Sequence, residues 1–182
     1  MTSGKQKLHT MRGFTIVELL IVIVVIAILA AITIVAYNGI QTRAQDSAVN
    51  SDLASIKKKI ELYKIDNNDL YPGGSDASSI LSTLDIKVTK SAYATTSTTE
   101  NNVWYCRNAA RSLFAVIALS KSGKIFYVTE SRGPTQYNGA EAWSSTLHNC
   151  NTMINLSLGW QYAGYASSDT TNGPWRAWVG GN

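Results

Sequence analysis

The chain has 182 residues, of which 16 are basic and 12 acidic, and it contains only two cysteines and two histidines. That length allows one globular domain with an appendage, and the composition excludes a cysteine-rich scaffold, a collagen-like repeat and a wholly disordered chain. Residues 1–13 hold three basic and no acidic side chains, which leaves a net charge of +1 on the rest. Charge-driven nucleic-acid binding therefore has little support.

An apolar run lies near the N-terminus. Between Leu19 and Ala36, eighteen residues, Thr33 is the only polar side chain. A helix that is apolar all round does not belong on the surface of a soluble domain, and eighteen residues span about 27 Å, close to the ~30 Å hydrocarbon core of a bilayer. The run is too long for a secretory signal peptide and no A-x-A-like site ends it. We expect a spanning helix, with the basic N-terminus in the cytoplasm and about 140 residues exported.

One acidic residue, Glu18, lies near the start of this apolar segment. A carboxylate within a membrane helix costs about 2.5–3.5 kcal/mol on insertion scales, so it usually marks a function. The alternative is a place near the interface, in the first helical turn, where the helix dipole favours an acid. The residues alone leave both interpretations open.

Residues 12–40 resemble the N-terminus of type IV prepilins and pseudopilins. The resemblance combines a basic leader, Gly13, Phe14 and Glu18 with a continuous apolar helix. It implies that a membrane-embedded aspartyl prepilin peptidase cuts between Gly13 and Phe14, and that the new Phe14 amine is N-methylated. It also implies that Glu18 pairs with the Phe14 amine of a neighbouring subunit as the helix moves from the bilayer into a filament.

Physical chemistry agrees with what the resemblance implies. Gly13 lets the backbone approach a protease closely, and pairing an amine with Glu18 neutralises two charges that are costly in lipid. Many members of the family carry a proline early in the mature helix, whereas this sequence has no proline between residues 14 and 71. Gly39, which costs about 1 kcal/mol relative to alanine in a helix, is where we expect any melting on assembly; an uninterrupted helix is the alternative.

Beyond Gly39 the pattern becomes that of an amphipathic helix ending near residues 66–68, before the Pro and Gly residues at 72–74. Its apolar stripe recurs at spacings of four and three residues and consists of Val49, Leu53, Ile56, Ile60 and Tyr63. Residues 57–59 are lysines that lie outside this stripe, and Asp52 also lies outside it. We expect the lysines to form a solvated face, with an interaction patch as the alternative.

The rest of the chain predicts a β-rich head. Residues 76–85 fit a short helix with Asp76 near its start, and residues 94–102 fit a polar loop. Apolar runs at 103–106, 113–119 and 125–128, with a turn at 121–123, predict an antiparallel sheet covered on one face by the amphipathic helix.

From Gly133 onward we expect short strands and loops rich in aromatic residues. These aromatics fit core packing and subunit contacts, with a sugar- or DNA-stacking surface as the alternative. They are Trp143, Trp160, Tyr162, Tyr165, Trp175 and Trp178.

Cys106 and Cys150 are too few and too far apart for the usual zinc spacings. In an exported head a disulfide is the expected state, contributing about 4 kcal/mol in the chain-entropy model; two free thiols are the alternative.

No catalytic, cofactor-binding or metal site is predicted, so we do not expect an enzyme. His148 is the only histidine outside the leader, and no nucleophile elbow accompanies it. Asp66 and Asp69 fit the end of a helix as well as a calcium ligand set, because the full loop pattern is missing. The glycosylation triplet at 155–157 is the kind expected by chance.

The sequence therefore predicts an α+β pilin fold, with a long N-terminal helix, half transmembrane and half amphipathic, packed on an antiparallel sheet. The expected parts are a leader at 1–13, a transmembrane or filament-core segment at 14–38, an amphipathic segment at 39–68 and a head at 69–182.

The resemblance implies a structural subunit of a type IV pilus-like surface filament, anchored in the membrane before processing and extracellular afterwards. Its partners would be copies of itself, the prepilin peptidase and N-methyltransferase, the inner-membrane assembly platform with its ATPase, membrane lipid before assembly, and nucleic acid only if the filament takes up DNA. The alternatives are a pseudopilin or minor pilin of a secretion or DNA-uptake machine, and a membrane-anchored extracellular binding module.

Overall fold

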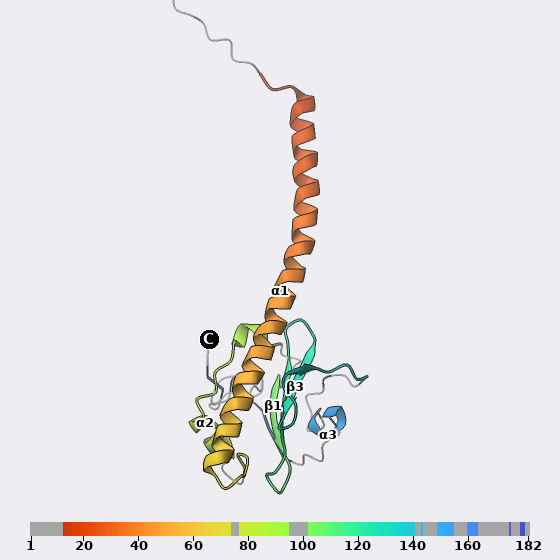
Figure 1. Cartoon of the computed structure of the whole chain (residues 1–182). Helices are drawn as coiled ribbons and strands as arrows, with labels where there is room; N and C mark the ends of the chain where they lie inside the picture. The colour runs from red at the N-terminus through yellow and green to blue at the C-terminus, as the bar shows by residue number, and fades with distance from the viewer. Residues whose placement is uncertain are drawn as a thin grey trace, which may run out of the picture. The chain divides into compact units, whose positions relative to one another are not determined.

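The chain divides into two compact units, Met1–Ile40 and Gln41–Asn182, in the computed structural model (Figure 1). The structure describes residues 13–73, 77–94, 102–140, 143, 149–154, 160–163, 175 and 179–180. Several predicted features lie outside these residues: the leader at 1–12, Asp76, the polar stretch at 95–101, His148, the triplet at 155–157, Tyr165 and Trp178.

Helix α1 runs from Ile16 to Asp66, which confirms the predicted long helix. It passes through Gly39 without interruption, and a Cβ placed there would meet no atom within 4 Å. The helix is therefore continuous in the isolated chain, and whether it melts at Gly39 or stays continuous on assembly remains a matter of prediction.

The end of α1 is fixed by a backbone cap. Asn68 and Asp69 adopt left-handed conformations, with φ of 54° and 58°. The N–H groups of Asn67 and Asp69 both donate to the Lys64 carbonyl at 3.1 Å, and the Asn67 side chain donates to the Tyr63 carbonyl at 2.8 Å. These bonds satisfy carbonyl groups of the last turn that have no partner within the helix. The polar residues 66–69 are therefore explained by the end of the helix.

The head contains a five-stranded antiparallel sheet within the described residues, in the order β4-β3-β2-β1-β5. The three predicted strands are confirmed, and Gly123 supplies the positive φ of 88° in the turn between β2 and β3. The strands are β1 (Val103–Arg107), β2 (Phe114–Leu119), β3 (Ile125–Thr129), β4 (Thr135–Gln136) and β5 (Trp160–Ala163).

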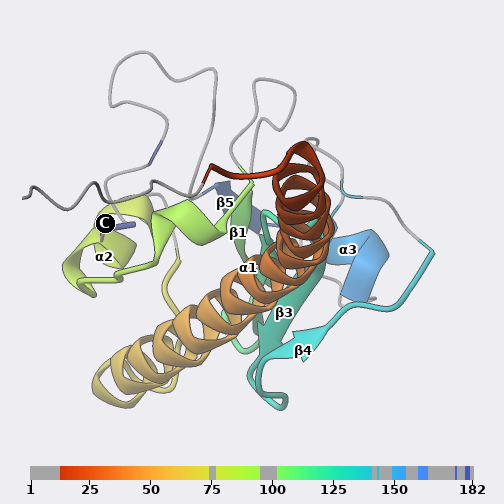
Figure 2. The same ribbon diagram turned by 90° about the horizontal axis from the view of Figure 1, so that it is seen from above.

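The second part of α1 crosses one face of this sheet (Figure 2). The predicted stripe is confirmed, since four of its five residues are at most 1% exposed and Tyr63 is half-buried. Alternate residues of the central strands point to the helix and complete the main core. The contributions are Val49, Leu53, Ile56 and Ile60 from α1, Val103 and Tyr105 from β1, Phe114, Val116 and Ala118 from β2, and Phe126 and Val128 from β3.

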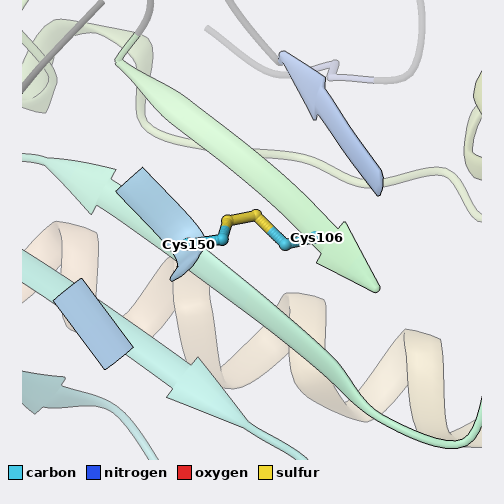
Figure 3. Close-up of a disulfide and its surroundings, with 2 residues drawn as sticks. All are labelled: Cys106 and Cys150. Carbon is cyan, nitrogen blue, oxygen red and sulfur yellow. A yellow bond between two sulfur atoms is a disulfide. The ribbon is translucent and has the colours of Figure 1, made fainter. Parts of the chain in front are cut away.

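The opposite face of the sheet carries a smaller core and the disulfide. Cys106 of β1 is bonded to Cys150 of helix α3 (Asn149–Ile154), with the two Cα atoms 6.3 Å apart and both residues fully buried (Figure 3). Trp104, Ile117 and Met153 pack in the same cluster. Because both faces are covered, β1 and β2 are buried along their whole length.

Two short elements flank the second part of α1. Helix α2 spans Ala77–Thr83, within the range expected for a short helix, and the 3₁₀ helix η1 spans Lys90–Ala92. A parallel bridge joins Lys87 to Gly180 and an antiparallel bridge joins Tyr93 to Ser120. Trp175 stands edge-on to Tyr93 at 5.7 Å between ring centroids, so this C-terminal aromatic packs against the core.

The expectation of a solvated lysine face is wrong for two of the three lysines. Lys57 donates to the carbonyl groups of Thr129 and Glu130 at 2.5 Å each, and Lys59 donates to the Asp85 carbonyl. Lys58 alone is exposed. Long side chains at the edge of the buried stripe can extend their ammonium groups to backbone carbonyls of the head, which the stripe pattern does not reveal.

Two carboxylates of α1 fasten the helix to the head. Asp46 is 8% exposed; its Oδ1 accepts from the hydroxyls of Ser120, at 2.8 Å, and Ser122, and its Oδ2 pairs with Lys124 Nζ at 2.8 Å. Burial alone would raise the pKa of Asp46, but the hydrogen bonds from Lys124, Ser122 and Ser120 and the Lys124 charge hold it below its ordinary value.

The second of these carboxylates, Asp52, is half-buried. It accepts from the Thr89 N–H at 2.7 Å and from the Tyr93 hydroxyl at 3.1 Å. Burial raises the pKa of Asp52 above its ordinary value, and these hydrogen bonds only partly oppose the rise. The same burial, with the neighbouring carboxylate, raises the pKa of Tyr93. The pKa values of Asp46 and Asp52 are therefore shifted in opposite directions along one helix.

Candidate functional site

The candidate site lies at the start of α1, where Thr15 and Glu18 cap the helix reciprocally. The Thr15 N–H and hydroxyl both donate to Glu18 Oε2, at 2.9 and 2.7 Å, and the Glu18 N–H donates to Thr15 Oγ1 at 3.2 Å. This is the capping-box arrangement, in which a Thr and a Glu three residues later satisfy orphan donors of the first turn. Glu18 also lies in the turn where the helix dipole favours an acid.

The first part of α1, which follows this cap, is exposed along its whole length. Every residue from Ile16 to Ile40 is exposed, including large apolar side chains such as Ile16, which is 84% exposed. Glu18 is the only charged residue between Phe14 and Thr42. α1 is also long and apolar enough over one window to cross a membrane. Such a surface requires lipid or other helices around it, because apolar area left in water costs about 25 cal/mol per Å².

Only one oxygen of the Glu18 carboxylate is occupied. Both donors from Thr15 reach Oε2, and Oε1 accepts no hydrogen bond from any residue that the structure describes. The carboxylate is thus oriented by its own helix while one acceptor stays open at the surface. Chemically, this arrangement can receive a cation or an N–H donor from outside the chain.

Gly13 and Phe14 precede the cap in a segment without regular secondary structure, and both are exposed. A Cβ at Gly13 would meet no atom within 4 Å. Local packing therefore does not require glycine at this position, and Phe14, 83% exposed, makes no core contact. The structure brings Gly13, Phe14 and Glu18 together at one helix end.

The remaining predicted site residues lie in the head. Cys106 and Cys150 form the disulfide, a structural tie rather than a part of the helix end. Within the described residues, no three His, Cys, Asp or Glu side chains gather as a metal site. Thr15 was not singled out from the sequence, although the spacing Thr-x-x-Glu ahead of an apolar run is a recognisable capping signal.

Comparison with known proteins supports the choice of this helix end as the candidate functional site. Residues 8–34 match the family model described as the prokaryotic N-terminal methylation motif, a range that contains Gly13, Phe14, Thr15 and Glu18. No solved structure matches the chain significantly.

Similarity to curated proteins extends over more residues than that motif. The chain is 36% identical over 130 residues to the type IV wide pilus major component PilA4 of Thermus thermophilus, covering 71% of this chain and 89% of that protein. It is 34% identical over 64 residues to the type II secretion system core protein G of Pectobacterium carotovorum, covering 35% and 40%. The corresponding protein of Escherichia coli is 34% identical over 61 residues, covering 34% and 41%. With its helix, sheet and N-terminal motif, the chain belongs to the type IV pilin and type II secretion pseudopilin family.

Proposed function

We propose that the chain is the structural subunit of a type IV pilus-like surface filament, made as a prepilin and assembled through the first part of α1. The observation that carries this proposal is a capped, half-occupied carboxylate at the start of an uncovered apolar helix. A helix of that kind is stable in a bilayer before assembly and among other copies of itself afterwards. In this function the chain carries out no catalysis of its own.

The first step is cleavage between Gly13 and Phe14 by a prepilin peptidase, followed by N-methylation of the Phe14 amine. The motif match over residues 8–34 supports this step. So does the exposed segment around Gly13, where a Cβ would meet no atom within 4 Å. Because glycine has no side chain, a peptidase can approach the backbone closely at this position. That role would explain a glycine whose own surroundings leave room for a side chain.

The second step pairs Glu18 with the Phe14 amine of a neighbouring copy. Oε1 is the acceptor left open by the cap, so the amine can bind without breaking either bond from Thr15. An unpaired carboxylate enclosed by apolar helices would be strongly penalised, whereas a hydrogen-bonded pair is tolerated. Only one axial offset between neighbouring helices brings the two charges together, so the pair sets the register.

A surface pilus is favoured over a secretion pseudopilus because of how far each similarity extends. The match to the pilus component covers 89% of that protein and includes most of the head, whereas the matches to secretion protein G cover about two-fifths of theirs. Under this proposal the partners are other copies of the chain, the peptidase and N-methyltransferase, and an inner-membrane assembly platform with its ATPase. The subunit spans the membrane before processing and is extracellular afterwards.

The test is mass spectrometry of material sheared from the cell surface. We expect a chain that begins at Phe14 and carries one added methyl group. The variant Glu18→Gln should be cleaved normally but yield at least about tenfold fewer filaments, because the amine loses its charged partner. Glu61→Gln, which removes a carboxylate from the same helix inside the head, is the matched control and should assemble. Normal filament yield from Glu18→Gln would exclude the pairing.

Processing is tested separately with a pair of glycine variants. Gly13→Leu should retain residues 1–13 and stay in the membrane fraction. Gly133→Leu is the control, because a Cβ at Gly133 also meets no atom within 4 Å, and it should be cleaved. A wild-type chain that keeps Met1 and is found only in membranes would instead support an anchored binding module.

A further inference from the structure

A cavity lies beside α1 at the beginning of the head. Its volume is about 320 Å³, and its lining residues come from α1, from the segment around η1 and from the turn between β2 and β3. The Lys121 N–H donates to the Ala92 carbonyl at 2.8 Å, which holds the turn against η1. The lining residues are Gln41, Ala44, Gln45, Ala48, Thr89, Ser91, Ala92 and Lys121.

The chemistry of the lining favours an anion. Gln41 and Gln45 offer amide N–H donors, Ser91 offers a hydroxyl, and Lys121 offers an ammonium group. Lys121 is exposed and makes no ion pair with any residue in the described part of the chain. No lining residue is acidic. A lining that offers hydrogen-bond donors and a cation, and no carboxylate, suits a phosphate group.

The acidic groups nearest the cavity are already engaged. Asp46, on the same stretch of α1, is held by Lys124 and two serine hydroxyls. Asp52, one helical turn beyond Ala48, accepts from the backbone and hydroxyl groups of Thr89 and Tyr93. Lys90, which lies between the lining residues Thr89 and Ser91 in the chain, adds a further cation, with its Nζ 5.7 Å from the Trp175 ring centroid. The local balance of charge is therefore positive.

The cavity begins within a few residues of the membrane-spanning segment. The apolar run ends at Ala36, and Gln41 follows five residues later in the same helix. At about 1.5 Å per residue this corresponds to about 8 Å, roughly the depth of a lipid headgroup layer outside the hydrocarbon core. A cavity so close in the chain to the bilayer surface lies within reach of lipid headgroups.

We propose that this cavity binds the phosphate headgroup of an anionic membrane lipid before the subunit enters the filament. The inference rests on the proposed membrane insertion of the apolar run, not on Glu18 pairing or filament formation. Lys121 supplies the charge, and the glutamine and serine side chains donate to the phosphate oxygens. The contact holds the β2–β3 turn and η1 against the bilayer surface, and extraction of the subunit releases it.

Hydrogen–deuterium exchange of the full chain in lipid nanodiscs tests the proposal. Co-elution of the chain with the discs first establishes insertion, so failure to insert is distinguished from failure to bind a headgroup. Exchange in residues 88–94 and 120–124 is then compared between discs of phosphatidylcholine and discs containing phosphatidylglycerol. We expect about fivefold slower exchange with phosphatidylglycerol, the contribution of one basic residue near an anionic surface.

Two variants and one soluble probe make the outcome specific. Lys121→Gln should abolish the protection. Lys58→Gln removes an exposed charge that lies on α1 about 26 Å beyond the lining residue Gln41, and this variant should retain the protection. Equal exchange in both kinds of disc, or protection that survives Lys121→Gln, would overturn the proposal. Protection by inorganic phosphate in phosphatidylcholine discs, matching that by phosphatidylglycerol, would also overturn it, because the site would then bind a soluble anion.

Discussion

The ion pair between Asp46 and Lys124 should make a measurable contribution to the stability of the head. The pair joins α1 to the β2–β3 turn with 2.8 Å between Nζ and Oδ2, and the side chains are 11% and 50% exposed. Exposed pairs contribute about 0.2–1 kcal/mol, and breaking a fully buried pair costs about 3–5 kcal/mol. A half-exposed lysine with a buried aspartate falls between these limits. We therefore expect a coupling energy of about 1 kcal/mol.

A double-mutant cycle measures this coupling. Asp46→Asn should cost about 1.5–3 kcal/mol, because the amide replaces a charged acceptor for two serine hydroxyls as well as for the lysine. Lys124→Gln should cost about 1 kcal/mol. Urea unfolding of the full chain in detergent, followed by tryptophan fluorescence, reports on the head alone, since all five tryptophans lie beyond residue 102. A coupling energy below about 0.3 kcal/mol, the range of independent sites, would refute the reasoning.

The same pair has a defined pH dependence. The pKa of Asp46 in the folded chain lies below its ordinary value of 3.8, so its contribution is fully present above that value. The contribution is lost as the pH falls through the folded-state pKa, because the unfolded chain then binds a proton that the folded chain resists. The stability difference between wild type and Asp46→Asn should therefore shrink below about pH 3.8. A difference that stays constant down to pH 2 would show that the charge is not involved.

Three further predictions concern the core, the disulfide and the second carboxylate of α1. Leu53→Ala should cost about 3–5 kcal/mol in urea unfolding, because Leu53 is 0% exposed, whereas Leu62→Ala, at a position 52% exposed, should change stability by less than about 0.5 kcal/mol. Replacing Cys106 and Cys150 by serine should cost about 4 kcal/mol, because the bond closes a loop across 44 positions; an unchanged urea midpoint would contradict this. The raised pKa of Asp52 predicts that wild-type stability falls as the pH rises from 3.8 to the folded-state pKa, and Asp52→Asn should remove that fall.

Much of the fold was predictable because its signals are periodic and strong. The stripe from Val49 to Ile60 fixes which face of α1 is buried, and the apolar run at 113–119 predicts the buried strand β2. Helix α3, in contrast, has only six residues and no apolar period. Its place is fixed by Cys150 and Met153 on the second face of the sheet, which are tertiary contacts that no local pattern encodes.

The contacts of charged residues were the least predictable part of the molecule. Asp46 precedes Val49 by three positions and so continues the apolar stripe, which was the available signal that this carboxylate is buried. Its partners Ser120 and Lys124 come from a turn more than seventy residues away. Lys57 and Lys59 similarly reach carbonyl groups of distant segments. Sequence periodicity locates a face, but the partner across that face depends on how the chain closes.

Glu18 illustrates why two interpretations of one residue need not compete. The residues alone left open whether this carboxylate serves its own helix end or a function, and the resemblance favoured pairing with a neighbouring subunit. The geometry holds one oxygen at the helix end and leaves the other available for the partner that we propose. Oε2 is held by Thr15, so the side chain is already ordered and Oε1 is presented at the surface. In the proposed filament, pairing with an amine would then require little further ordering of the glutamate, whose side-chain entropy is otherwise worth about 1.5–2 kcal/mol. Under this proposal Thr15 is a positioning residue for assembly, because the bonds that cap the isolated helix also orient the carboxylate toward its proposed partner.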